Sequence, residues 1–126
     1  MLAADLRSEY EGYFVVRTQA TAQLFAEAVV PAVGRFDAAE VERMMAAAEF
    51  RTDPADVPSN VPALIVTARH DAFVGHRRQQ ELADRYPRAT VALVADAGHA
   101  VPHERPQVVR ALLADLLDRV DADREA

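Results

Sequence analysis

Two short polar loops hold the residues of this sequence that could do acid–base chemistry. The first loop, RHDAFVG, contains Asp71, and the second, DAGHAVPHERP, contains His99. Each loop follows a short β-rich segment, and the carboxyl ends of parallel strands open onto the ligand crevice of an α/β protein. If the two segments pair side by side, a carboxylate and an imidazole meet at one edge of the sheet. A histidine base needs such a partner, because the acid holds the ring in one tautomer and stabilises the imidazolium.

The elements that must position these loops are predicted in the order β, α, β, α. Residues 62–67, PALIVT, form a continuous apolar run typical of a buried parallel strand, and residues 89–94, ATVALV, form a second short β-rich run. A polar helix is predicted between them over residues 76–86, and right-handed crossovers would make the strands parallel. A long amphipathic helix then begins near Pro106, which suits the first helical turn. Its apolar stripe comprises Val108, Val109, Leu112, Leu113, Leu116, Leu117 and Val120.

The first part of the chain, residues 1–50, is predicted to be helical. One helix is expected to follow Thr18 and to end at Pro31. The apolar face of this helix comprises Leu24, Phe25, Ala28 and Val29. Residues 12–16, GYFVV, fit a short strand and the start of a helix equally well.

A second helix is predicted over about residues 38–50. Asp37-Ala-Ala-Glu40 has the form of a capping box, in which the Asp37 side chain accepts an N3 amide and Glu40 reaches back to the cap. The residues that this helix is expected to bury are Val41, Met44, Met45 and Ala48. Residues 51–61 then hold several proline and turn signals, and they form the expected linker to the strand-containing part, residues 62–126.

The size and composition of the chain limit its function classes. With 126 residues, 51% of them hydrophobic and 27% charged, the chain is long enough for one globular domain. A net charge of −6 argues against a nucleic-acid-binding surface, and the absence of cysteine excludes disulfides, thiolate metal sites and a cysteine nucleophile. No segment has the pattern of a secretory signal or the apolar length of a membrane helix. We therefore expect a cytoplasmic protein that does not bind membranes.

A metal site is not expected in the second loop. His99 and His103 lie four residues apart beside Glu104, a spacing that suits a metal pair on a helix, but Pro102 interrupts this segment. Glu104 is expected to order the loop or to cap the last helix, and Asp96 is expected to lie in a turn. No cofactor is expected either.

The strand-containing part resembles the end of an α/β-hydrolase. The acid loop of that family, P-x-L-x-x-x-G-x-x-D, is matched at Pro62, Leu64 and Asp71. Its histidine loop, G-H-x-x-x-x-E-x-P, is matched at Gly98, His99, Glu104 and Pro106. The resemblance implies that the chain carries the last two strand-helix units of the hydrolase core and that residues 1–50 correspond to the lid and the helix after it. It also implies that Asp71 and His99 are the acid and the base of a catalytic triad.

The nucleophile of such a triad is not recognisable in this sequence. Family members place it in a G-x-S-x-G elbow upstream of the acid, and the residue after it contributes to the oxyanion hole. The two serines, Ser8 and Ser59, lie outside any such motif. We therefore expect the carboxyl-terminal part of a hydrolase, as a fragment, a truncation or one piece of a split protein. The strand at residues 62–67 would then have an open edge that could bind a partner chain or a second copy.

Two function classes remain open. In the first, the chain completes a serine-type hydrolase of esters, or of carbon–carbon bonds in small oxo acids, once a partner supplies the nucleophile, and its substrate is a small molecule. In the second, the chain is a non-catalytic hydrolase remnant that binds a partner or itself. For single residues, Asp71 could instead cap the helix that starts near His76. Tyr13, Phe14 and Phe25 could line an acyl pocket or pack in the core.

Overall fold

A computed structural model describes residues 4–48, 52, 56 and 59–125 of the chain. Strands β1 (Ala63–Ala68) and β2 (Ala89–Val94) form a parallel sheet and are paired along their whole length. The predicted α/β class and the parallel order of the strands are confirmed. Continuous apolar segments form these strands because helices cover both of their faces.

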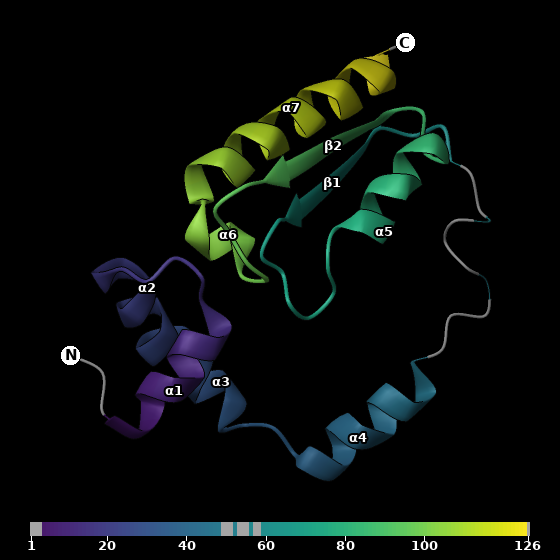
Figure 1. The fold of residues 1–126 in the computed structure, drawn as a ribbon. Helices are drawn as coiled ribbons and strands as arrows, with labels where there is room; N and C mark the ends of the chain where they lie inside the picture. Colours follow the sequence, from purple (N-terminus) through teal and green to yellow (C-terminus); the bar gives the residue numbers. More distant parts are fainter. Residues whose placement is uncertain (1–3, 49–51, 53–55, 57–58, 126) are drawn as a thin grey trace.

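Figure 1 shows β1 and β2 lying between helix α5 (Arg77–Gln80) on one side and helix α7 (Pro106–Glu125) on the other. A short helix, α6 (Val101–Glu104), precedes α7. The last helix begins at the proline, as predicted, because the first turn of a helix leaves its N–H groups unpaired and so tolerates a residue that has none.

The helix predicted over residues 76–86 is shorter than expected and changes type. α5 is followed directly by a 3-10 helix, η3 (Glu81–Asp84). No side chain caps the N-terminus of α5, and Arg77 and Arg78 lie in this short helix, close to its positive end. The helix dipole disfavours positive charge there, so both features weaken a regular α-helix.

Half of the apolar stripe of α7 faces the sheet. Val109 packs against the buried cluster of Ala68, Ala97 and Val101. The rest of the partly buried half comprises Leu112, Leu116 and Val120, whereas the exposed half comprises Val108, Leu113 and Leu117. Neither α7 nor any other helix in the described part of the chain combines the length and the apolar character needed to cross a membrane.

The helical first part begins with α1 (Ala4–Tyr13) and α2 (Gln19–Leu24). Residues 12–16, which could have been a strand, end α1 and continue as a loop. Thr18 caps α2, because its hydroxyl accepts a hydrogen bond from the Thr21 amide at 3.2 Å.

Aromatic side chains form the core of this helical part. Phe14 and Phe25 are buried, and their ring centroids lie 5.5 and 5.7 Å from that of Tyr10. Tyr13 is partly buried, and its ring lies 4.9 Å from that of Phe14. Core packing therefore accounts for the aromatic residues that could also have lined an acyl pocket.

The predicted end of a helix at Pro31 is wrong. The chain remains helical through a π-helical turn, η1 (Phe25–Val29), into α3 (Val30–Val33). In the π-turn the Val30 amide donates to the Phe25 carbonyl, one residue further back than in an α-helix. This wider turn accommodates the proline ring, and Pro31 lies in the first turn of α3, where its missing N–H is tolerated.

The second predicted helix, α4 (Ala38–Ala47), forms with the expected cap. The Asp37 carboxylate accepts hydrogen bonds from the Ala39 and Glu40 amides at 2.9 and 3.2 Å. The Glu40 side chain does not complete the capping box but pairs with Arg43 at 3.0 Å. The cap therefore depends on the aspartate alone.

The predicted burial of α4 is wrong. Met44 and Met45 are 67% and 72% exposed, and Val41 and Ala48 are also exposed. Figure 1 shows α4 standing apart from the sheet and its helices. The apolar face of α4 has nothing to pack against among the described residues, and Phe50, the expected last residue of the helix, lies outside them.

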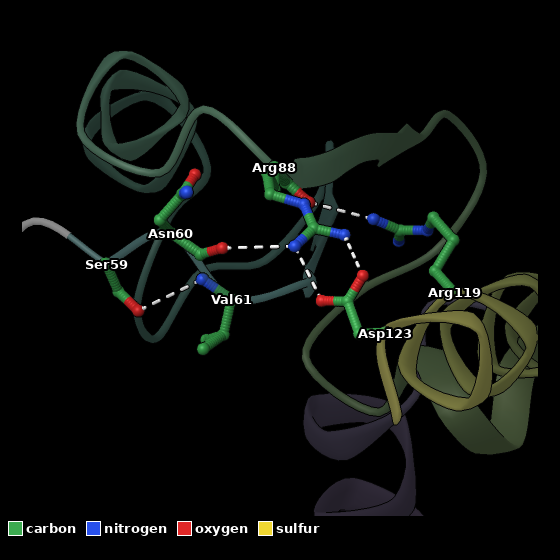
Figure 2. Close-up of polar contacts among 6 residues, drawn as sticks. All are labelled: Ser59, Asn60, Val61, Arg88, Arg119 and Asp123. Carbon is green, nitrogen blue, oxygen red and sulfur yellow. Dashed lines mark hydrogen bonds and ion pairs between the residues drawn. The ribbon is translucent and has the colours of Figure 1, made fainter. Parts of the chain in front are cut away.

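Polar contacts tie α7 to the start of both strands (Figure 2). Arg88 forms a two-bond ion pair with Asp123, with 2.6 Å between each nitrogen–oxygen pair. These hydrogen bonds hold the pKa of Arg88 above, and the pKa of Asp123 below, the ordinary value. Arg119 donates to the Arg88 carbonyl at 2.8 Å, to the Ala63 carbonyl at 3.2 Å and to the Thr90 hydroxyl at 2.9 Å. The cluster lies at the end of the sheet where both strands begin, opposite to the two polar loops.

Most of the predicted linker, residues 51–61, lies outside the described residues. Its last part leads directly into β1, where the Val61 amide donates to the Ser59 hydroxyl at 3.4 Å. The Asn60 carbonyl accepts a hydrogen bond from Arg88 at 3.2 Å (Figure 2). The end of the linker is thus held beside the start of β2.

Candidate active site

The two polar loops meet because the strands stay hydrogen-bonded beyond their ends. Ala68 and Val94 are the last paired residues of the ladder. The Arg69 amide then donates to the Val94 carbonyl at 2.9 Å, and the His70 amide donates to the Ala97 carbonyl at 3.0 Å. The first loop is therefore fixed to the second before either reaches its candidate functional side chain.

Asp71 and His99 are in contact at this edge of the sheet, as their places in the sequence predicted. His99 Nδ1 lies 3.2 Å from Asp71 Oδ2. Asp71 Oδ1 accepts hydrogen bonds from the Phe73 amide at 2.9 Å and from the Val74 amide at 3.0 Å. The Asp71 side chain is 11% exposed and the His99 side chain 46%. The carboxylate is therefore sheltered and held by the backbone, whereas the ring remains accessible.

The surroundings of Asp71 favour its charged form. Burial alone would raise the pKa of Asp71, but hydrogen bonds from the Val74 amide, the His99 ring and the Phe73 amide outweigh it, so this pKa lies below its ordinary value. An ionised carboxylate favours the ring tautomer that carries its proton on Nδ1, which leaves Nε2 as an acceptor. Within the described residues, no hydrogen-bond partner occupies Nε2.

Asp71 does not cap the following helix. The residue at the N-cap of α5 is His76, whose side chain makes no capping hydrogen bond. The two amide contacts of Asp71 instead close a turn over residues 71–74. The backbone of this turn therefore holds the carboxylate in place for the imidazole.

Sequence reasoning missed an aromatic neighbour of the imidazole. The ring centroid of Phe73 lies 5.1 Å from that of His99, and Phe73 is 71% exposed. Its place two residues after Asp71 is the sequence signal that could have indicated this contact. The exposed Phe73 ring therefore places an apolar surface beside the accessible imidazole.

Glu104 orders the second loop from inside the protein, which is one of its two expected roles. The residue is 5% exposed. Its Oε2 atom accepts a hydrogen bond from the Gly98 amide at 2.5 Å, and its Oε1 atom accepts hydrogen bonds from the Val15 and Val16 amides at 2.5 and 2.9 Å. The carboxylate thus joins the histidine loop to the segment that follows α1, a contact that no sequence pattern indicated.

The other residues considered from the sequence lie outside this contact. Asp96 is in a turn, as predicted, and its carbonyl accepts a hydrogen bond from Arg105 at 2.9 Å. Ser8 lies on α1, and Ser59 lies before β1, near the cluster of Arg88 and Asp123 (Figure 2). His103 is exposed on α6, and in the part of the chain that the structure describes no three His, Asp or Glu side chains are arranged to hold a metal.

Comparison with known proteins assigns the chain to a family. Residues 40–125, about two thirds of the chain and both polar loops, match the α/β-hydrolase family described as TAP-like protein. The chain belongs to the TAP-like family of α/β-hydrolases. In the TAP-like match, Asp71 and His99 both fall within the matched residues.

The TAP-like chain is also similar to a solved structure, that of a thermophilic esterase from Thermogutta terrifontis with malate bound. The TM-score is 0.50 and the sequence identity is 26%, over 56% of this chain and 26% of the esterase chain. This chain therefore spans about a quarter of the length of the esterase. The likeness concerns the fold of that part.

Proposed function

We propose that this chain supplies the acid and the general base of a serine-hydrolase triad, with Asp71 as the acid and His99 as the base. The observation that carries the proposal is the 3.2 Å contact between His99 Nδ1 and Asp71 Oδ2, made by a carboxylate whose other oxygen is held by two amides. Such a carboxylate fixes the orientation of the imidazole and stabilises the cation that forms when Nε2 takes a proton.

In the proposed reaction, a serine hydroxyl adds to the substrate carbonyl and gives its proton to His99 Nε2. The imidazolium then passes that proton to the leaving group, and an acyl-enzyme remains for water to hydrolyse. The substrate class is an ester, or a small oxo acid whose carbon–carbon bond is cleaved. The family assignment and the exposed apolar ring of Phe73 beside the base support this class.

The serine of the proposed triad belongs to a polypeptide segment outside residues 1–126. Ser59 precedes β1, and a strand of this length separates it from the site by roughly 20 Å. Ser8 lies on α1 and has no elbow motif around it. We propose that the segment carrying the serine pairs with the open edge of β1, which has β2 as its only strand neighbour among the described residues. Residues 1–50 would then serve as the lid.

Complementation tests the proposed function. The chain is mixed with the polypeptide encoded directly upstream of it, and hydrolysis of p-nitrophenyl acetate is followed. We expect the mixture to be active and each polypeptide by itself to be inactive. His99→Ala should lower the rate of the mixture by roughly 10³-fold or more, because the residues of a triad act as a unit. His103→Ala, four residues away and exposed on α6, is the matched control and should keep full activity. An upstream sequence without G-x-S-x-G, or an active His99→Ala mixture, would contradict the proposal.

A serine-reactive phosphonate gives an independent test. The reagent should label the upstream polypeptide and leave the mass of this chain unchanged. Labelling of Ser8 or Ser59 would show that the nucleophile lies in this chain.

A second candidate function is a non-catalytic module that binds a partner. The observation that favours it is the exposed apolar surface of α7, formed by Val108, Leu113 and Leu117, together with the open edge of β1. Such a module would bind the same upstream polypeptide without hydrolysing esters. Its binding would also be unaffected by His99→Ala, whereas the enzyme would lose its rate.

A further inference from the structure

We propose that Glu104 is a positioning residue for His99, through which the helical segment of residues 10–25 holds the imidazole in place. This proposal rests on the proposed role of His99 as a base. Contacts on both sides of His99 along the chain carry it. Gly98 and Ala100, the residues before and after His99, pack against the helical segment, whereas the His99 ring points toward Asp71.

The residue before His99 is held by Glu104 and by a close approach of the backbone. The Glu104 carboxylate accepts the Gly98 amide on one oxygen and the amides of Val15 and Val16 on the other. A Cβ atom added at Gly98 would lie 2.6 Å from Val15 Cγ2. With Val15 in place, any residue larger than glycine at position 98 would force the loop or the Val15 side chain to shift.

The residue after His99 is held by the aromatic core. Ala100 is 3% exposed and belongs to the same buried cluster as Tyr10, Phe14 and Phe25. The histidine is therefore flanked by two residues that the helical segment immobilises. Since a side chain on a fixed backbone has few rotamers to choose from, this packing directs the imidazole toward the carboxylate.

Glu104 makes the loop and the helical segment depend on each other. It forms no ion pair among the described residues, so three backbone N–H groups satisfy its buried carboxylate. Burying a carboxylate is costly unless such donors are present. If the Val15–Val16 amides move away, the same carboxylate loses the donors that allow it to hold Gly98. Displacement of the helical segment should therefore release the imidazole.

Glu104→Gln tests this dependence in the full chain with little change of shape. A glutamine has one carbonyl oxygen and one NH₂ group, so either Gly98 or the Val15–Val16 amides must face a donor. In ¹⁵N spectra we expect Glu104→Gln to lower the proportion of His99 rings that are protonated on Nδ1. This proportion should approach the one found in the Asp71→Asn variant. The Gly98 amide should exchange with solvent at least about tenfold faster. Glu42→Gln, an exposed position on α4, is the control with the same loss of charge.

A folded Glu104→Gln chain with an unchanged His99 tautomer would overturn the proposal. If that variant does not fold, Gly98→Ala and the double variant Gly98→Ala with Val15→Ala decide the matter. The added methyl should disturb the His99 tautomer, and removal of the Val15 methyls should restore it. Absence of the disturbance or of the rescue would also overturn the proposal.

These readouts are independent of hydrolysis. Failure of the complementation assay with intact spectral changes would therefore refute the proposed function and leave the positioning role of Glu104 in place. The opposite outcome, hydrolysis without spectral changes, would refute only the positioning role.

Discussion

Arg119 holds α7 to the start of the sheet, and replacing it with methionine should destabilise the chain. Methionine keeps most of the apolar stem of the arginine but none of its donors. The Arg119 side chain is 29% exposed and donates to two backbone carbonyls and the Thr90 hydroxyl, in addition to Asp115 on its own helix. Arg119→Met removes all of these hydrogen bonds, although the Arg88 carbonyl keeps the Ala63 amide as a donor at 3.3 Å.

The expected magnitude follows from these contacts. A hydrogen bond to a charged group contributes about 1.5–3 kcal/mol when buried, and partial exposure of the guanidinium reduces this to roughly 1 kcal/mol for each of the three long-range contacts. The helical pair with Asp115 adds only about 0.3–0.5 kcal/mol. We therefore expect the free energy of unfolding to fall by roughly 3–3.5 kcal/mol, a large share of the ~5–15 kcal/mol typical of a domain.

Urea denaturation followed by circular dichroism measures this difference. Arg124→Met is the matched control, because Arg124 lies on the same helix, is 79% exposed and pairs, among the described residues, with Asp121 alone at 3.7 Å. The control should change stability by less than about 0.5 kcal/mol. If Arg119→Met and Arg124→Met have the same effect, the contacts of Arg119 do not hold the helix to the sheet, and the reasoning is refuted.

Three further predictions concern other parts of the chain. Met44→Gln should leave the free energy of unfolding within about 0.5 kcal/mol of the original, because the side chain is exposed; a loss above ~1 kcal/mol would show that α4 is packed. His99→Ala should raise the pKa of Asp71, measured by carboxyl ¹³C titration. A lowered pKa of Asp71 stabilises the folded chain at pH values above 3.8, and this contribution is lost as the pH falls from 3.8 through the pKa of Asp71 in the folded chain. Over this pH range the variant should therefore lose less stability than the original chain. Gly75→Ala should destabilise by about 1 kcal/mol because Gly75 has φ +76°, whereas Gly12→Ala in α1 should stabilise by roughly 0.5–1 kcal/mol; in thermal denaturation, a stabilised Gly75→Ala would contradict the first expectation and a destabilised Gly12→Ala the second.

The meeting of Asp71 and His99 could be predicted because it depends on local rules. Apolar runs of strand length, a helix between them and the handedness of crossovers determine that both loops follow the same edge of a parallel sheet. The contacts of Glu104 with Val15 and Val16 could not be predicted in this way. They join residues 89 and 88 positions apart in the sequence, and no periodic pattern encodes such a contact.

The wrong predictions have equally physical reasons. An apolar face on a helix indicates which side could be buried, but Met44 and Met45 show that burial also needs a neighbouring surface. Pro31 ends a regular α-helix, yet a π-helical turn before it let the chain remain helical. Propensity rules describe a residue within a regular element and miss such a local change of geometry.

The protonation state of the neutral His99 ring tests the central claim most directly. Side-chain ¹⁵N shifts, recorded at high pH on the full chain and on Asp71→Asn, distinguish a proton on Nδ1 from one on Nε2. We predict that Nδ1 carries the proton in the unmodified chain and that Asp71→Asn abolishes or reverses this preference, whereas the exposed control Asp84→Asn does not. A ring protonated mainly on Nε2, or a ratio that Asp71→Asn leaves unchanged, would contradict the pairing of His99 with Asp71 as base and acid.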